Sequence, residues 1–217
     1  MSSHSYTRRE ALLAGSSIWL AAKGLRAAEC APDRTDQALR EIARARSAVM
    51  SMSGPFTQER TIGLLAAKVR STGTLTLVRP DRLRWELGPP DDVVYWIVPE
   101  GLAYRGKTGG GRVSAGDNVA TALDDLRTLL GGDLTRLRVR YELTGMCEGN
   151  ETIVFEAVPK AGRAASVSKL VFSLASDLVA PRATTIFAGP RDRTEIWFGT
   201  MMKNIPVDAA KMRPPEG

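Results

Sequence analysis

The sequence predicts a mainly β domain of the α+β class, in which about eleven antiparallel strands form an unclosed barrel with a helical lid over an apolar cavity. From residue 56 onward, apolar and polar side chains alternate with a period of two in many short runs. Breakers of hairpin length separate these runs, which favours an antiparallel meander over βαβ units. So many strands do not form a flat sheet, so the sheet is expected to curl and enclose volume.

Two amphipathic helices interrupt the strands. The first covers residues 35–52 and is expected to end at the Ser-Gly-Pro sequence that follows it. The second covers residues 117–130, has leucines at helical spacing and ends at two glycines. Because two helices are too few to cover both faces of the sheet, we expect them on its concave side. The predicted strands are 56–62, 69–79, 82–87, 93–98, 101–106, 111–115, 136–143, 151–158, 167–175, 180–189 and 192–200.

The clearest alternation lies in residues 136–143, "RLRVRYEL". Its apolar side chains, including Tyr141, share one predicted face, and Arg136, Arg138 and Arg140 share the other. A solvated strand face is the favoured interpretation of this arginine row. Contact with an anionic headgroup or a partner is the less favoured alternative.

Residues 1–30 are predicted to be an export signal peptide, followed by a single domain over residues 31–217. A basic start with Arg8 and Arg9 precedes an apolar stretch that is too short to span a bilayer. The stretch "TRREALL" resembles a twin-arginine motif, and an ordinary Sec signal remains the alternative. Cleavage is expected between Ala22 and Ala31.

Charge and cysteine content argue against a nucleic-acid-binding protein and against a scaffold with several disulfides. The formal charge is +6, and the four basic and two acidic side chains of residues 1–30 leave about +4 on the mature chain. This charge is too small to indicate nucleic-acid binding. Cys30 and Cys147 make at most one disulfide, and the sequence leaves open whether they pair.

The sequence offers little support for catalysis, so we expect neither an enzyme nor a cofactor. The only histidine is His4, inside the predicted signal, which excludes His-dependent triads and leaves few zinc ligands. The glycines at 109–111 lack P-loop spacing and indicate a hairpin turn. The acidic pairs at 91–92 and 124–125 are expected to be solvated.

A known family is similar to this chain in residues 56–105 and 207–217. The shared features are Phe-x-Gln, a Gly-x-Leu strand, Arg-Pro, a following aromatic residue, a Pro-rich turn, Gly before an aromatic strand, and a tail that ends in Pro-Pro-x-Gly. Here they are Phe56 and Gln58, Gly73 and Leu75, Arg79-Pro80, Trp85, Pro89-Pro90, Gly101 before Tyr104, and "VDAAKMRPPEG". These features resemble LolA-type outer-membrane lipoprotein carriers. Arg84 departs from the family pattern.

The resemblance implies an eleven-stranded unclosed barrel covered by helices, working as a monomer in the periplasm. Such a carrier receives acylated lipoproteins from an inner-membrane ABC extractor and delivers them to an outer-membrane acceptor. Shielding is needed because each methylene removed from water contributes ~0.8 kcal/mol. The alternative is a carrier or sensor of another lipid or glycolipid in the same superfold.

The resemblance also implies the site. Arg79 matches the family arginine that bonds lid carbonyls and holds the empty cavity shut. Pro80 cannot donate to a ladder, so it marks a strand break and leaves Arg79 at the rim. No metal or catalytic residue is expected. The predicted cavity-lining residues are Leu75, Leu77, Leu83, Trp85, Trp96 and Tyr141, and those of the lid helix are Leu123, Leu126 and Leu130.

Overall fold

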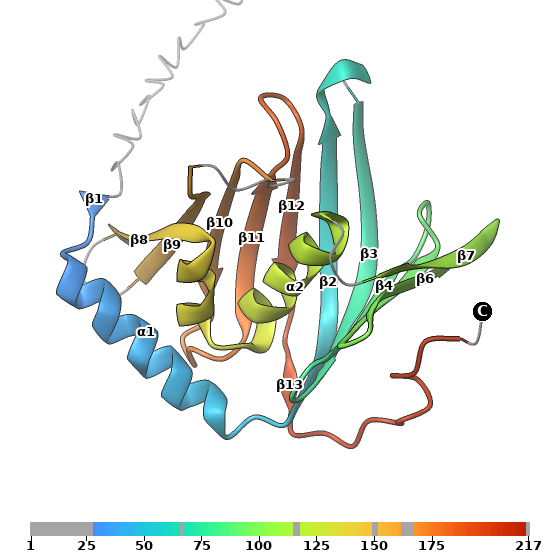
Figure 1. Cartoon of the computed structure of the whole chain (residues 1–217), viewed down its shortest axis with the longest axis horizontal. Helices are drawn as coiled ribbons and strands as arrows, with labels where there is room; N and C mark the ends of the chain where they lie inside the picture. Colours follow the sequence, from blue (N-terminus) through green and yellow to red (C-terminus); the bar gives the residue numbers. More distant parts are fainter. Residues whose placement is uncertain (1–27, 66, 115–117, 149–151, 162–166, 216–217) are drawn as a thin grey trace, which may run out of the picture.

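One antiparallel sheet runs through the protein (Figure 1), whose computed structural model describes residues 28–65, 67–114, 118–148, 152–161 and 167–215. The predicted signal peptide lies outside these residues except for its last three positions. The helical elements are α1 Pro32–Ser47, η1 Gly63–Leu65, α2 Asn118–Gly131 and η2 Leu134–Val139. The strands are β1 Ala28–Glu29, β2 Ser51–Ile62, β3 Ala67–Val78, β4 Arg82–Leu87, β5 Val93–Val98, β6 Gly101–Gly106, β7 Gly109–Ser114, β8 Tyr141–Glu148, β9 Thr152–Pro159, β10 Lys169–Leu174, β11 Pro181–Phe187, β12 Arg193–Phe198 and β13 Met202–Lys203.

The sheet confirms the predicted mainly β, unclosed architecture. The strands lie in the order β1-β8-β9-β10-β11-β12-β2-β3-β4-β5-β6-β7, and β13 also pairs with β2. Within the described residues β7 and β1 are the two ends of this path and do not pair, so the barrel stays open. Two of the thirteen strands, β1 and β13, have only two residues each, which leaves eleven longer strands, the number that the sequence predicts.

Both helices lie on one side of the curved sheet. In Figure 1, α2 crosses in front of the central strands and α1 runs along the side of β8 to β11. The apolar face of α1 is buried through Leu39 and Ile42, which are 2% and 1% exposed. The core therefore lies between the helices and the concave face of the sheet.

The first helix is shorter than the sequence predicts, and the Ser-Gly-Pro sequence does not end it. α1 ends at Ser47, and both Gly54 and Pro55 lie inside β2. A Cβ at Gly54 would lie 2.6 Å from the carbonyl oxygen of Thr200, so only glycine permits this close approach of two backbones. Pro55 sits where β12 has already ended, and its carbonyl accepts from the Gly199 N–H at 2.8 Å. The missing proline N–H therefore interrupts no ladder.

The predicted strand over residues 136–143 is wrong. Residues Leu134–Val139 form the 3-10 helix η2, and β8 starts only at Tyr141. The carboxylate of Asp133 accepts hydrogen bonds from the N–H and the hydroxyl of Thr135, which caps a helical turn where the period-two pattern indicated a strand. The predicted common apolar face is lost as well, because Leu137 is 0% exposed and Val139 is 63% exposed.

A disulfide joins the start of α1 to the sheet, which answers the question that the sequence left open. Cys30 and Cys147 are bonded, with their Cα atoms 5.2 Å apart. β1 pairs with β8 next to this bond, and the Cys30 N–H donates to the Gly145 carbonyl at 2.7 Å. The segment before α1 is thus tied to the edge of the sheet.

Candidate functional site

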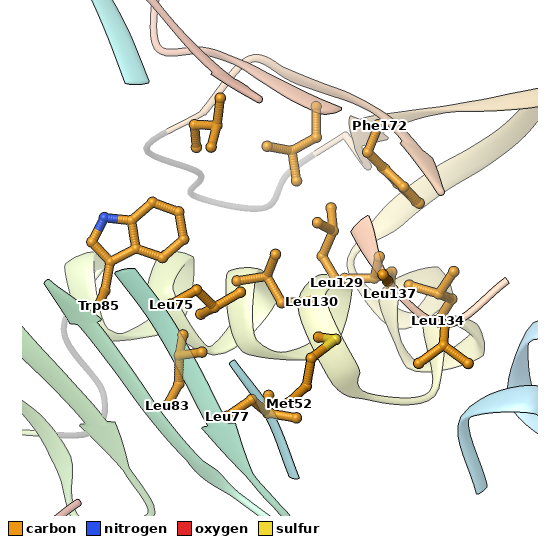
Figure 2. Packing of buried hydrophobic residues seen from close by; sticks show 14 of the residues in the cluster. Met52, Leu75, Leu77, Leu83, Trp85, Leu129, Leu130, Leu134, Leu137 and Phe172 are labelled. Carbon is orange, nitrogen blue, oxygen red and sulfur yellow. The ribbon is translucent and has the colours of Figure 1, made fainter. Parts of the chain in front are cut away.

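The apolar face of α2 fills the concave side of the sheet. Leu129 and Leu130 are 1% and 0% exposed, and they lie in one cluster with Leu75, Leu77 and Leu83 of β3 and β4 (Figure 2). Alternate residues of these strands point to the same face, so the predicted lining leucines reach the helix together. In this structure the strand leucines pack against side chains of α2, so the helix closes the concave face.

An aromatic cluster continues the same face. Trp85 is 5% exposed, and its ring centroid lies 4.1 Å from that of Phe56 and 6.1 Å from that of Phe198. These three side chains come from β4, β2 and β12, which are not all adjacent in sequence. The predicted lining residue Trp85 is thus on the concave side and in the main core.

Arg79 lies at the end of β3 and reaches the C-terminus of α2. Its backbone N–H donates to the Met50 carbonyl at 2.9 Å, and its Nη2 donates to the Gly131 carbonyl at 2.7 Å. A Cβ at Gly131 would lie 2.6 Å from Cδ2 of Leu77, so glycine lets the last residue of α2 approach β3 this closely. The structure therefore places Arg79 against a helix carbonyl, the kind of group that the resemblance implies for it.

A second arginine, Arg46, holds the same helix end from the other side. It lies near the end of α1, is 1% exposed, and donates to the carbonyls of Leu129 and Gly132 at 3.0 Å each. Its Nε also donates to the Val179 carbonyl at 3.2 Å. Burial, and to a smaller extent the charge of Arg79, lower the pKa of Arg46 to about 10, so the guanidinium remains charged at neutral pH. Cations at a helix C-terminus also interact favourably with the helix dipole.

The sequence prediction missed Arg46, although a signal was present. Arg46 follows Leu39 by seven positions and Ile42 by four, which places it on the buried face of α1 rather than on the solvated one. An arginine at such a position needs several acceptors, because a buried charge without partners is costly. That requirement points to exposed backbone carbonyls such as those of a helix end.

Asp125 anchors the middle of α2, although the sequence analysis predicted that its carboxylate would be solvated. Asp125 is 2% exposed, forms an ion pair with Arg140, and accepts from the Tyr141 hydroxyl at 2.6 Å. Burial and this hydrogen bond raise the pKa of Tyr141, so its hydroxyl stays protonated and donates. The predicted lining residue Tyr141 therefore lies in the core as an anchor for α2.

Trp96 does not lie with the other predicted lining residues. Leu83 pairs with Ile97 on the concave face, and Arg84 pairs with Trp96 on the opposite face. The prediction that Trp96 lines the concave face was therefore wrong. The Trp96 indole N–H donates to the Lys211 carbonyl of the C-terminal tail at 2.9 Å. The guanidinium carbon of Arg84, which departs from the family pattern, lies 5.8 Å from the Trp96 ring centroid. Tail, arginine and indole together cover the outer face of β4 and β5.

The three leucines predicted for the lid helix all belong to α2. Leu130 is fully buried and Leu126 packs against the same cluster. The side chain of Leu123 lies outside the described part of the structure.

A cleft opens beside this closed core, between α1 and the strands β9 and β10. Its volume is about 480 Å³, within the range of ligand sites. Ile42, Phe155 and Leu174 contribute apolar lining. Arg34 and Arg182 contribute positive charge and Glu41 contributes one negative charge, so the lining carries a net charge of +1. Such a combination suits a ligand that has an apolar chain and an anionic group.

The described residues show no metal centre. No group of three or more His, Cys, Asp or Glu side chains there is arranged to hold a metal ion. Nor does this part of the chain contain a helix long and apolar enough to cross a membrane.

The comparisons with known proteins agree with this arrangement. The fold and site define an open antiparallel barrel whose concave face is closed by a helix. Residues 47–101, from the end of α1 through β5, match the model of the outer membrane lipoprotein carrier protein LolA. This quarter of the chain is therefore similar to the LolA family. A search of the curated proteins found no match.

Solved structures resemble the fold at low sequence identity. A crystal structure of MucB has a TM-score of 0.50 at 14% identity, with 84% of this chain and 63% of that chain covered. The Pseudomonas aeruginosa MucA/MucB complex has a TM-score of 0.47 at 15% identity, covering 84% and 61%. A putative outer membrane lipoprotein-sorting protein domain from Vibrio parahaemolyticus has a TM-score of 0.49 at 9% identity, covering 81% and 94%. This chain spans less than two thirds of either MucB chain.

Proposed function

We propose that this protein is a periplasmic carrier that binds the acyl chains of lipoproteins and shuttles them from the inner to the outer membrane. The observation that carries the proposal is that noncovalent contacts alone close the concave face. Apolar side chains of α2 occupy the space on β3 and β4, and hydrogen bonds from Arg79 and Arg46 hold the helix end there. Neither attachment is covalent, so the helix can leave.

The energies of exchange favour such a device. Fully burying a leucine side chain contributes about 1.5–3 kcal/mol, so Leu129 and Leu130 together contribute about 3–6 kcal/mol to closure. Ten methylenes of an acyl chain contribute about 8 kcal/mol when they replace these side chains on the sheet. Binding can therefore open the lid, and the restored Arg79 bond then favours release of cargo to an acceptor.

The residues before a cleavage site between Ala22 and Cys30 act in this proposal as the export signal, and the mature domain begins after that site. The disulfide between Cys30 and Cys147 supports both the compartment and the position of cleavage. Disulfides persist in the oxidising periplasm, and a cleavage site before Cys30 keeps this bond in the mature protein. The partners are acylated lipoproteins, an inner-membrane ABC extractor and an outer-membrane acceptor, and the carrier works as a monomer without cofactor or enzymatic activity.

A carrier or sensor of another lipid or glycolipid is the second candidate. The cleft between α1 and β9–β10 favours it, because the charges of Arg34 and Arg182 beside an apolar lining suit a free anionic lipid. The two candidates differ in cargo and in the site that binds it.

Binding of a synthetic triacylated lipopeptide tests the proposal. The same peptide without acyl chains is the matched control, and phosphatidylglycerol represents the second candidate. We expect the lipopeptide to bind and to raise hydrogen exchange of the α2 amides, because an occupied sheet leaves the helix unpacked. Equal binding of the unacylated peptide, or no binding of either, would contradict a carrier of acyl chains. Preference for phosphatidylglycerol would favour the second candidate.

A further inference from the structure

A second cleft lies directly beside the arginine that holds α2. Its volume is about 400 Å³, and it lies among the turn after β3, the last turn of α2 and the start of η2. Arg79, Arg127 and Arg136 line it, together with Asp81, Thr128 and Gly131. Three cationic side chains therefore meet one acidic side chain in a cleft that contains the hydrogen bond between Arg79 and α2.

Two of the three arginines donate hydrogen bonds to backbone carbonyls, and in the described part of the chain the third does not. Arg79 donates to the Gly131 carbonyl at 2.7 Å, and Arg127 donates through Nη1 to the backbone carbonyl of Asp81 at 2.8 Å. Arg136 is exposed, and within the described residues its side chain makes no hydrogen bond or ion pair. The cleft thus combines two positioned guanidinium groups with one that has its donors available.

The charges favour an anion in this cleft. Three arginines and one aspartate carry a net charge of +2, and the C-terminus of α2 offsets about −0.5 of it. At present Arg79 faces a carbonyl oxygen with only a partial negative charge. A phosphate or carboxylate offers a full charge and two oxygens, and guanidinium bonds to such groups are about twice as strong as bonds to neutral acceptors. An anion therefore competes well with Gly131 for Arg79.

We propose that this cleft binds a phosphate or carboxylate group, and that the bound anion takes Arg79 from the Gly131 carbonyl and so loosens the C-terminal end of α2. The proposal deepens the proposed function and rests on it, because Arg79 acts there as the latch. It adds a trigger: an anionic group at the rim, rather than the acyl chain alone, starts the opening.

Arg46 limits how far the end of α2 moves when the bond from Arg79 breaks. Arg46 holds Leu129 and Gly132 from inside the core and is 1% exposed, so an anion in the cleft has no access to its donors. The helix end consequently stays attached at Arg46 when Arg79 lets go. The charge of Arg79 also disfavours the charged form of Arg46, so an anion beside Arg79 relieves a repulsion between the two arginines.

Hydrogen exchange of α2 in the mature, oxidised protein tests the proposal. Inorganic phosphate is titrated at constant ionic strength against chloride, and exchange is followed by mass spectrometry in peptides that contain residues 126–132. We expect phosphate to accelerate exchange with a saturable dependence. Unchanged or slower exchange at every phosphate concentration would overturn the proposal. A soluble short-chain phosphatidic acid and the matched diacylglycerol distinguish the two sources of the anion: a lower half-saturating concentration for phosphatidic acid identifies a lipid headgroup, and equal values identify free phosphate.

The substitution Arg136→Gln tests whether the anion sits in this cleft. Its side chain makes no bond in the described structure, so we expect the fold to persist, which the unfolding midpoint verifies. Loss of one exposed guanidinium contact should raise the half-saturating phosphate concentration roughly two- to fivefold. Arg40→Gln, on the exposed face of α1, is the matched control and should leave this concentration unchanged. An equal effect of both substitutions would place the anion elsewhere. If the triacylated lipopeptide binds the wild-type protein while phosphate has no effect, only this proposal fails and the carrier function stands.

Discussion

Replacement of Arg46 by methionine is the most informative change to the interior. Three guanidinium N–H groups donate to the carbonyls of Leu129, Gly132 and Val179 at distances of 3.0, 3.0 and 3.2 Å. A hydrogen bond from a charged donor contributes about 1.5–3 kcal/mol, and each buried carbonyl left without a donor costs about 1–3 kcal/mol. Removal of the buried charge also removes its desolvation cost, which offsets part of the loss. We expect Arg46→Met to lower the free energy of unfolding by about 3–5 kcal/mol.

Urea unfolding of the oxidised protein, followed by circular dichroism, measures this loss. Arg40→Met makes the same exchange on the exposed face of α1 and should change the free energy of unfolding by less than about 0.5 kcal/mol. The difference between the two variants isolates the three buried bonds from any effect on helix propensity. A loss below about 1 kcal/mol for Arg46→Met would refute the reasoning, because the carbonyls would then be satisfied without Arg46.

Three further variants test other contacts of the fold. We expect Arg79→Leu to accept cargo but to fail in its release, because leucine cannot restore the closing bond; normal transfer to outer-membrane vesicles would show that Arg79 is only a solvated strand end. Tyr141→Phe removes the hydroxyl that donates to Asp125 and should lower the free energy of unfolding by about 1–2 kcal/mol in urea, whereas an unchanged value would contradict a role as an anchor. Replacing both Cys30 and Cys147 by alanine should lower that free energy by about 2–4 kcal/mol, since the bond joins positions 117 residues apart; unaltered stability would argue against the bond in solution.

Much of the sheet was predictable because its hairpins are local. The alternation in residues 82–87, 93–98 and 101–106 predicted β4, β5 and β6 with the bounds that the structure has. Short Gly- and Pro-containing turns separate these strands, so the pattern and the breakers indicated the same elements. In contrast, the alternation before Tyr141 was overruled by the Asp133 cap.

The face of each strand was harder to predict than the strand itself. Trp96 alternates as well as Trp85 does, but alternation alone does not say which set of residues faces the helices. The register across β4 and β5 decides it, and the outer face also turned out to be covered, by the tail that binds Trp96 through Lys211. Trp96 is buried on the outer face because the tail covers it. The sequence did not indicate where the tail packs, so it could not distinguish Trp96 from a residue that lines the concave face.

The bonds that hold α2 depend on contacts far apart in sequence. Arg46 lies 83 positions before Leu129, and no local pattern links them. Arg79 was found only through the resemblance of its surroundings to a known family. The sequence indicated that α2 covers the sheet, but the contacts that hold it there come from the folded chain.

The central claim is that the concave face carries acyl chains of lipoproteins. The most direct test is purification of the protein from its native envelope, followed by mass spectrometry of what co-elutes with it. The account predicts acylated protein bound to the wild type, and more of it on Arg79→Leu, which does not release its cargo. Recovery of free lipid or glycolipid alone would favour the second candidate, and recovery of no acyl-bearing molecule with either form would contradict the account.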